Sequence, residues 1–384
     1  MTNNSSVEKP KELVVTPPPQ ITGAMSKTRI MTYTFAALLA ITIITAILWW
    51  PAMTPHSDVI AWYGLTGVFA MPLGAILLVN ALIAIGVAVI SDFVIGKAAV
   101  DSEVNTMSAA VFGLIVALSY SIGIPTMNMG EVLPLSMLCA PGCFIYVALI
   151  SFIGLVVFKK LQGGLFGRKL VNPAAAAKLL VLLPFLTSTF LVKDHWAAID
   201  AGGMGVPRLA SNLVGEYGTF ADSIRGCYGL PGADPASLNS LMLLTKFHGW
   251  PGGASSIVVI FVGAVLIFLL RDYFKWKITA TYLGSAAVMA LVMYGIYGGD
   301  LVTRLLFTLF VGSSIFLAFF MATDPASTPY SRTGQILFGI GLGVLTVLIQ
   351  TYMNFFGGAL LALVIMNLTV PLLDRIGIHK PFGR

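Results

Sequence analysis

The sequence predicts an all-α protein that crosses the membrane many times. Of its 384 residues, 57% are hydrophobic and only 10% are charged, whereas about 25% of the residues of a soluble domain are charged. So few charged side chains cannot cover a water-exposed surface of this size. Long apolar stretches recur along the chain, and no alternating strand pattern accompanies them. The composition therefore excludes the soluble fold classes.

Ten stretches are long and apolar enough to span a bilayer, which takes about 20 residues per helix. The residues before the first stretch are polar and include the run Pro17–Pro19, so we expect a disordered tail there. The ten stretches lie near residues 31–50, 66–91, 106–124, 132–158, 174–192, 254–270, 280–297, 303–322, 335–353 and 357–373. The chain divides into five parts: a tail (1–30), a first five-helix half (31–192), a loop (193–253), a second five-helix half (254–376) and a short tail (377–384).

The positions of the basic residues predict the orientation. If the spans alternate in direction, most of the 22 Lys and Arg residues fall on one side of the membrane. Cytoplasmic loops carry an excess of basic residues, so both termini are predicted to be cytoplasmic and the loop at 193–253 external. Because each half has an odd number of spans, the two halves have opposite orientations, as in the inverted repeats of transporters.

The connection between the fourth and fifth spans is rich in glycine and ends in Asn172-Pro173. Gly163, Gly164 and Gly167 allow the backbone to approach a ligand or a neighbouring helix closely. Asn at the N-cap and Pro at the first helical position are typical of a helix start. The connection is either a capped cytoplasmic turn or a cofactor pocket at a helix N-terminus, where free N–H groups favour negative charge.

A second non-helical segment, Thr323–Pro329, separates the eighth and ninth spans. Its two prolines predict a helix break. Asp324 and Thr328 are among several hydrogen-bonding groups that this break brings to the membrane surface. The segment is a simple connection or part of a binding site.

The spans themselves offer little chemistry for ion transport. Acidic residues inside a membrane mark proton or cation relays, and none of the 16 Asp and Glu residues lies near the middle of a predicted span. The three Cys and four His residues show no metal-ligand spacing. The sequence therefore argues against a chain that pumps ions by itself.

In the external loop, Asp234 is followed by Ser237 and Ser240 and then by the apolar run Leu241–Leu244. On its own this pattern predicts a turn that leads into an apolar helix, with Asp or Ser as the cap.

Several of these features resemble one family when they are taken in order. They are the Gly-Gly…Asn172-Pro173-Ala turn, the Thr323-Asp324-Pro325 turn followed by Thr333-Gly334, and the ending Asn367-Leu-Thr-Val-Pro371-Leu-Leu-Asp374. The family contains the D subunit of the Rnf complex, an ion-translocating ferredoxin:NAD oxidoreductase, and the B subunit of the sodium-translocating NADH:quinone reductase. The resemblance covers residues 25–376, and the short tail before the first span favours the Rnf protein.

This resemblance implies a ten-helix bundle similar to urea and ammonium channels, built of two inverted halves. It also implies a flavin mononucleotide (FMN) held by a phosphoester to a Thr on the external side. In the family's attachment pattern, Asp234 matches the Asp, Ser237 the Ser and Ser240 the flavinylated Thr, while Leu238-Asn239 replace a Gly-Ala pair. The two cytoplasmic turns, with Asn172, Pro173, Asp324 and Thr328, are expected to approach each other and line a site for a second, non-covalent flavin such as riboflavin, or a docking surface for another electron carrier.

The implied function is that of a membrane subunit of an Rnf-type electron-transport complex. Such a protein passes electrons between its partners while the assembly moves Na⁺ or H⁺. The expected partners are the other membrane and peripheral subunits and the lipid bilayer, without nucleic acid, in the cytoplasmic membrane of a prokaryote. The alternatives are a secondary transporter or channel, the B subunit of the quinone reductase, and a structural scaffold of the same complex.

Overall fold

The computed structural model describes residues 26–51, 72–98, 105–120, 142–162, 169–181, 250–270, 273–297, 301–310, 314–352 and 358–376. Regular structure in these residues is helical, and no strand occurs among them. In the first half the helices are α1 (Lys27–Leu48), α3 (Leu73–Ala98), α4 (Thr106–Ser119), α6 (Gly142–Ile153), the π-helical segment η1 (Gly154–Leu161) and a helix at 173–181. In the second half they are η2 (Pro251–Gly253), α12 (Ser256–Leu269), α13 (Trp276–Tyr297), α14 (Leu301–Phe310), α15 (Ser314–Phe316), the π-helical segment η3 (Leu317–Met321), α16 (Arg332–Tyr352) and α17 (Gly358–Ile376).

Six of the described helical segments are long and apolar enough to cross a membrane. They are α1, α3, α6 with η1, α13, α16 and α17, and a seventh span results if α14 and the segment Ser314–Met321 form one broken span with a bend of 53°. α4 and α12 are apolar but shorter, with 14 residues each. Each of the ten predicted stretches contains a described helix. The all-α, multi-pass membrane class is confirmed, and the count of ten spans stays a prediction.

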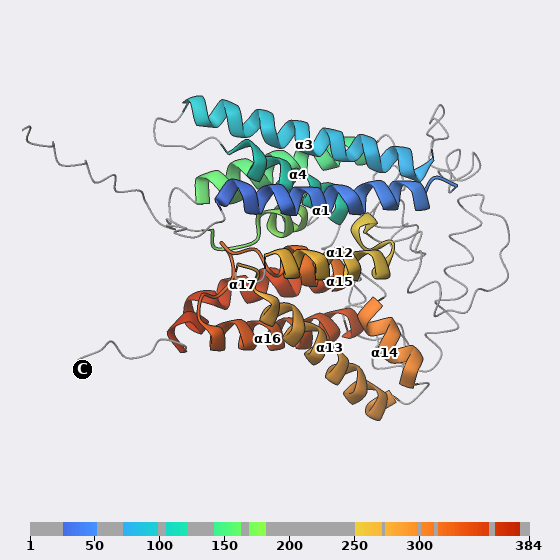
Figure 1. Cartoon of the computed structure of the whole chain (residues 1–384). Helices are drawn as coiled ribbons and strands as arrows, with labels where there is room; N and C mark the ends of the chain where they lie inside the picture. The colour runs from blue at the N-terminus through green and yellow to red at the C-terminus, as the bar shows by residue number, and fades with distance from the viewer. Residues whose placement is uncertain are drawn as a thin grey trace, which may run out of the picture.

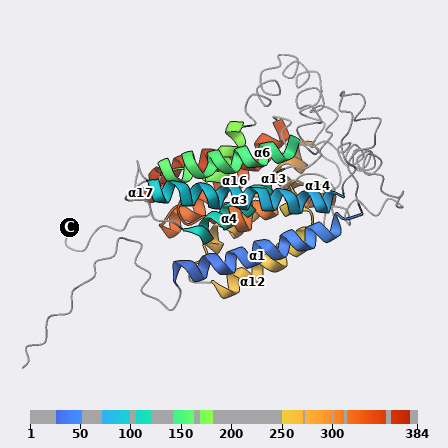
Figure 2. The ribbon, with the colours of Figure 1, turned by 90° about the horizontal axis from the view of Figure 1, so that it is seen from above.

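The two halves pack against each other as two layers (Figure 1). Helices of the first half, coloured blue to green, lie above those of the second half, coloured yellow to red, and α1 lies beside α12 when the molecule is seen from above (Figure 2). One hydrophobic core contains residues of both layers, such as Leu114 of α4 and Phe316 of α15. The Thr45 hydroxyl of α1 also donates to the Pro251 carbonyl, at 3.2 Å. The halves therefore form one packed body.

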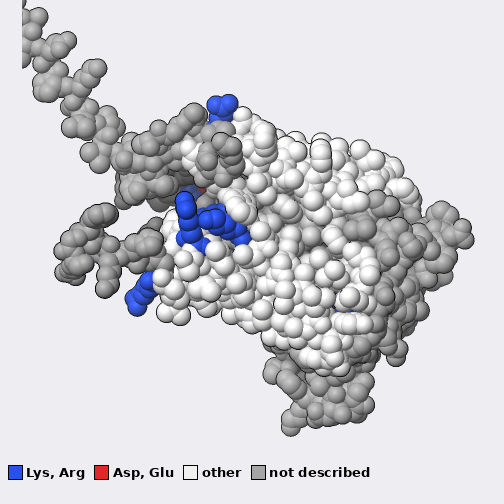
Figure 3. Space-filling view, turned by 60° about the horizontal axis from the view of Figure 1, so that its bottom comes forward, with Lys and Arg blue, Asp and Glu red and all other residues white. Residues whose placement is uncertain are grey.

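Charged side chains gather at one end of this body, which we call the basic end. There α1 and α13 begin and α3 and η1 finish, with Arg29, Lys97, Lys159 and Lys275. Figure 3 shows this cluster of Lys and Arg beside a face with almost no other charge. An apolar belt with charges gathered beyond it is the surface expected of a membrane protein.

A glycine sets the distance between α3 and α4. A Cβ atom on Gly113 would lie 2.7 Å from the Ala84 carbonyl oxygen and 2.7 Å from the Ile85 Cα. Such contacts are possible only without a side chain, and small residues at crossings let membrane helices approach closely.

We predict that Gly113→Val lowers the thermal stability of the purified protein, because the new side chain must push α3 away from α4. Overpacking of this kind costs about 1–3 kcal/mol. Gly86→Val on α3 is the matched control, since a Cβ on Gly86 meets no atom within 4 Å. Melting followed by size-exclusion chromatography in detergent measures both variants. Equal melting temperatures for the two would contradict the close approach.

Candidate functional site

Asn172 begins the helix at 173–181 and joins it to the second half. Its side-chain oxygen accepts hydrogen bonds from the backbone N–H groups of Ala174 and Ala175, at 3.1 and 3.2 Å. This is the predicted N-cap, with Pro173 at the first helical position. The side-chain amide of Asn172 also donates to the Met321 carbonyl at the end of η3, at 3.1 Å.

Asn367 of α17 completes this junction from the other side. Its side-chain oxygen accepts the backbone N–H of Asn172 at 2.9 Å, and its amide donates to the Ser327 carbonyl at 2.9 Å. Both asparagines are almost fully buried. Asn367 lies nine residues from each end of α17, which places the junction about 14 Å from the basic end. The two turns predicted to approach each other thus meet deep in the bundle.

The turn after η3 is held by its own side chains. Asp324 accepts hydrogen bonds from the Ala326 N–H and the Ser327 hydroxyl, and the Thr328 hydroxyl donates to the Asp324 carbonyl at 2.6 Å. Lys275, just before α13, donates to the Thr328 hydroxyl oxygen at 2.7 Å and to the Thr328 carbonyl at 3.1 Å. These bonds satisfy the polar groups of a turn that enters an apolar layer.

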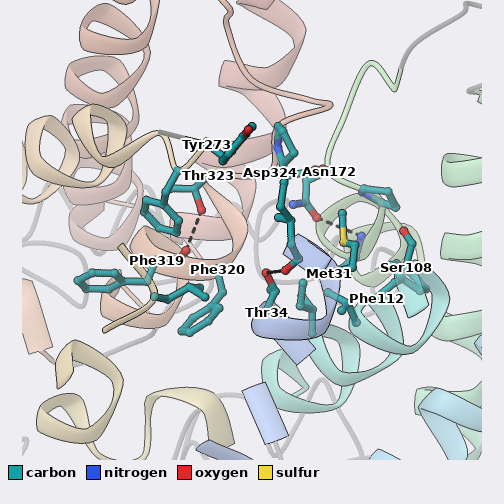
Figure 4. Close-up of a pocket in the computed structure, with 18 of the residues that line it drawn as sticks. Met31, Thr34, Ser108, Phe112, Asn172, Tyr273, Phe319, Phe320, Thr323 and Asp324 are labelled. Carbon is teal, nitrogen blue, oxygen red and sulfur yellow. Dashed lines mark hydrogen bonds between the residues drawn. The ribbon is translucent and has the colours of Figure 1, made fainter. Parts of the chain in front are cut away.

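A cavity of about 130 Å³ lies between these two turns (Figure 4). It is partly open, and both halves of the chain line it. Figure 4 shows Phe319, Phe320 and Thr323 of the second half across from Phe112 and Asn172 of the first. The full lining comprises residues 30, 31 and 34 of α1, 108, 111, 112 and 115 of α4, Lys159, Lys169, residues 172–174, 266, 270, 273 and 274, and residues 319, 320 and 323–325.

The described wall of the cavity carries more basic than acidic side chains. Lys159 and Lys169 line it, and Asp324 is the one acidic side chain among the described residues of its wall. The buried Lys159 ammonium has no hydrogen-bond partner in the described part of the chain and lies 5.8 Å from the centre of the Phe112 ring. The neighbouring Lys160, by contrast, pairs with Asp92 at 2.8 Å. A buried ammonium without an acceptor favours a ligand with an anionic or oxygen-rich group.

The predicted site residues divide into three groups. Asn172, Pro173 and Asp324 line the cavity, as a binding role requires. Thr328 is buried beside it and bonds within the turn. Asp234, Ser237 and Ser240, the residues of the predicted FMN attachment, lie outside the described residues.

Sequence reasoning missed Lys159, the aromatic lining and the role of Asn367. Lys159 stands next to Lys160 at the end of a span, so it was indistinguishable from an ordinary basic residue at the membrane edge. Asn367 could have been found from the sequence, because it is a single side-chain amide within an apolar stretch. Such a group in a membrane helix must form hydrogen bonds with other parts of the protein.

Comparison with known proteins covers both turns that build this cavity. The sequence pattern of the NQR2, RnfD, RnfE family matches residues 14–383, nearly the whole chain. The chain belongs to the NQR2, RnfD, RnfE family. The family resemblance inferred from the ordered motifs is therefore confirmed, and the cavity lies between two of the turns that carried it.

Three relatives illustrate this membership of the NQR2, RnfD, RnfE family. The D subunit of the proton-translocating ferredoxin:NAD(+) oxidoreductase complex of Clostridium ljungdahlii is 30% identical over 246 residues, which cover 62% of this chain and 68% of that protein. The D subunit of the Na(+)-translocating ferredoxin:NAD(+) oxidoreductase complex of Acetobacterium woodii is 27% identical, over 73% of this chain and 74% of its own. The D subunit of the ion-translocating oxidoreductase complex of Aliivibrio salmonicida is 28% identical, over 60% of this chain and 70% of that protein.

We predict that Asn172→Ala destabilises the protein by more than an ordinary cap substitution does. It removes the cap and the bond to the Met321 carbonyl, and each buried group left unpaired costs about 1–3 kcal/mol. Asn105→Ala is the matched control, because Asn105 caps α4 through Ser108 and its side chain has no hydrogen bond to the second half among the described residues. Thermal unfolding in detergent measures both. A smaller loss for Asn172→Ala than for Asn105→Ala would show that the junction does not hold the halves together.

Proposed function

We propose that this chain is a membrane subunit of an Rnf-type, ion-translocating electron-transport complex. The named relatives are D subunits of such complexes, and the chain matches them over most of its length. In this function the protein carries flavin, passes electrons between its partners and is not active alone. The observation that carries the proposal is the partly open, aromatic-lined cavity at the junction of the two halves, with an ammonium that has no hydrogen-bond partner among the described residues.

The cavity residues fit a non-covalent flavin such as riboflavin. A flavin ring is flat and aromatic, with oxygen and nitrogen acceptors along its edge, and aromatic side chains stack against such rings. Phe112, Phe319 and Phe320 supply the aromatic surface, while Lys159 supplies a donor that lacks an acceptor among the described residues. The cavity has a volume of about 130 Å³ and is open on one side. One end of the flavin ring system would therefore lie inside it, and the rest would lie in the opening.

A bound flavin supplies the one- and two-electron chemistry, and the chain holds the ring and sets its surroundings. The Asn172–Asn367 junction fixes the cavity wall, and the Lys159 ammonium compensates negative charge that arrives with electrons. The positive-inside rule supports a cytoplasmic position for the basic end and for the side of the cavity that Lys159 and Lys169 line, in a prokaryotic cell membrane with both termini cytoplasmic.

The second proposed flavin is FMN bound covalently at Ser240, with Asp234 and Ser237 as parts of the attachment sequence. A serine hydroxyl can form the same phosphoester as the threonine of the family pattern. The predicted topology puts Ser240 on the external side. The cavity and Ser240 then serve electron transfer at opposite sides of the membrane.

Ion movement is proposed to be coupled through the assembled complex, with Na⁺ or H⁺ as the ion. The three acidic side chains in the described residues are Asp92, Asp324 and Asp374, and each lies in the last two turns of a helix or in a connecting turn. No carboxylate relay crosses the described part of the bundle.

A secondary transporter or channel is the second candidate function. The bend of 53° between α14 and Ser314–Met321 favours it, since transporters bind substrates at interrupted helices. Such a protein moves its substrate without partner subunits, whereas a member of an Rnf-type complex requires them. Substrate uptake by vesicles containing the purified chain alone would favour the transporter.

We predict that Thr34→Trp removes a non-covalent flavin from the purified complex, because Thr34 faces the cavity and the indole would fill it. Thr32→Trp is the matched control on the same helix. Both hydroxyls donate to the carbonyl four residues earlier, but Thr32 is exposed and does not line the cavity. Flavin released by acid precipitation is quantified by fluorescence. Equal flavin content in the two variants would refute the cavity as a flavin site.

We predict that Ser240→Ala abolishes the fluorescence of the denatured protein on a gel under ultraviolet light, since only a covalent flavin survives denaturation. Thr245→Ala retains the fluorescence, because Thr245 lacks the spacing of the attachment pattern. Peptide mass spectrometry gives the independent measurement. A peptide containing Ser240 at its unmodified mass, from an active complex, would exclude covalent attachment there.

A further inference from the structure

Lys178 is a basic side chain buried deep in the bundle, on the helix at 173–181 that Asn172 caps. Only 6% of its surface is exposed. Its ammonium donates to the Ser119 carbonyl at the end of α4 and lies 4.3 Å from the centre of the Trp250 ring. Ionisable side chains within membrane-spanning segments are costly and rare, so a buried one points to a function.

The ammonium has no carboxylate partner in the described part of the chain. The acidic side chains described there are Asp92, Asp324 and Asp374, and their bonds lie elsewhere. Asp92 pairs with Lys160, Asp324 bonds within its own turn, and Asp374 accepts the Tyr330 N–H at 2.8 Å. A carbonyl group is a dipole and an aromatic ring acts on a cation through its quadrupole, so neither brings a net negative charge that would neutralise a charged Lys178.

Two helices place this charge one turn beyond the cavity. Ala174 and Ile115 line the cavity, and Lys178 and Ser119 follow them by four residues on their respective helices. Residues four apart share a helix face and lie about 6 Å apart along the axis. The Lys178–Ser119 hydrogen bond therefore lies just beyond the deep wall of the cavity.

A column of aromatic rings fills the space between the cavity and this ammonium. Phe320 lines the cavity and stacks on Phe316, with ring centres 5.3 Å apart. Phe316 contacts Trp250 edge-on at 6.5 Å, and Lys178 lies over Trp250. Aromatic rings therefore lie between the ammonium and the cavity wall, so the field of the ammonium is screened less than it would be in bulk water.

We propose that Lys178 is a positioning residue that stabilises the reduced, negatively charged form of the electron carrier in the cavity. This inference rests on the proposed flavin-carrying function. One electron added to the carrier adds one negative charge to the cavity, and the protonated form of Lys178 compensates it. The nearby positive charge raises the midpoint potential of the carrier and increases the affinity of the protein for its reduced form.

A purely structural role is the competing explanation, because the ammonium also satisfies a carbonyl at the end of α4. The two roles differ in what a neutral substitute changes. Lys178→Gln keeps a hydrogen-bond donor, on a side chain one bond shorter, and removes the charge, whereas Lys178→Arg keeps both a donor and the charge. A structural role predicts changes in stability alone, while the proposed role predicts a change in redox behaviour that follows the charge.

The test is a spectroelectrochemical titration of the non-covalent flavin in the purified, assembled complex. The flavin that belongs to the cavity is the one lost in Thr34→Trp. In Lys178→Gln, the affinity for reduced flavin relative to oxidised flavin should fall about tenfold, as expected for unit charges roughly 10 Å apart at an effective dielectric constant of about 20. The midpoint potential of this flavin falls accordingly, and Lys178→Arg retains the original value.

An unchanged midpoint potential in Lys178→Gln, with the flavin still bound, overturns this inference and leaves the proposed function intact. If the wild-type complex contains no flavin that Thr34→Trp removes, both this inference and the proposed flavin-carrying function are wrong. If Lys178→Gln does not assemble, Lys178→Met provides the same neutralisation with an apolar chain, and its titration is judged by the same criterion.

Discussion

The paired asparagines Asn172 and Asn367 are the constraint on which the rest of the structure depends. A bilayer core offers no water to backbone groups, so every helix that begins or ends within it needs partners from the protein. The helix at 173–181 begins about 14 Å from the basic end, in the middle of an apolar body. The two side-chain amides satisfy its first N–H groups and the carbonyls at the ends of the facing segments. Without them, neither turn could lie where it does.

The cavity exists because of this junction. Two irregular segments meet there, and both follow π-helical stretches, η1 and η3, which are rare and often lie at functional sites. The irregular backbone leaves a space that regular helices would close, and the surrounding phenylalanines keep it apolar. Its polar groups come from helices, as with Lys159 of η1, and from the two turns, as with Asn172 and Asp324. Together with the phenylalanines they give a planar, polar-edged molecule both a stacking surface and donors.

Much of the architecture was predictable from local sequence, and much of the site was not. Apolar stretches fixed the fold class, and Asn172-Pro173 predicted a helix start that the structure confirms. The two turns were singled out because Gly and Pro break helices regardless of context. Lys178 is unusual as a basic residue inside a predicted span, but the roles of Lys159 and Lys178 arise from partners distant in the sequence, such as Phe112, Ser119 and Trp250. Which side chains a buried cation meets is a tertiary property, and no local pattern encodes it.

The junction also has a consequence for the order in which the protein is made. The backbone N–H of Asn172 bonds to a side chain 195 residues later in the chain. During synthesis the first half is therefore made before this partner exists, and the N–H group cannot form the bond until α17 has been added. Until then the group must be satisfied by other means, such as water, the insertion machinery or a chaperone. Docking of α17 completes the junction.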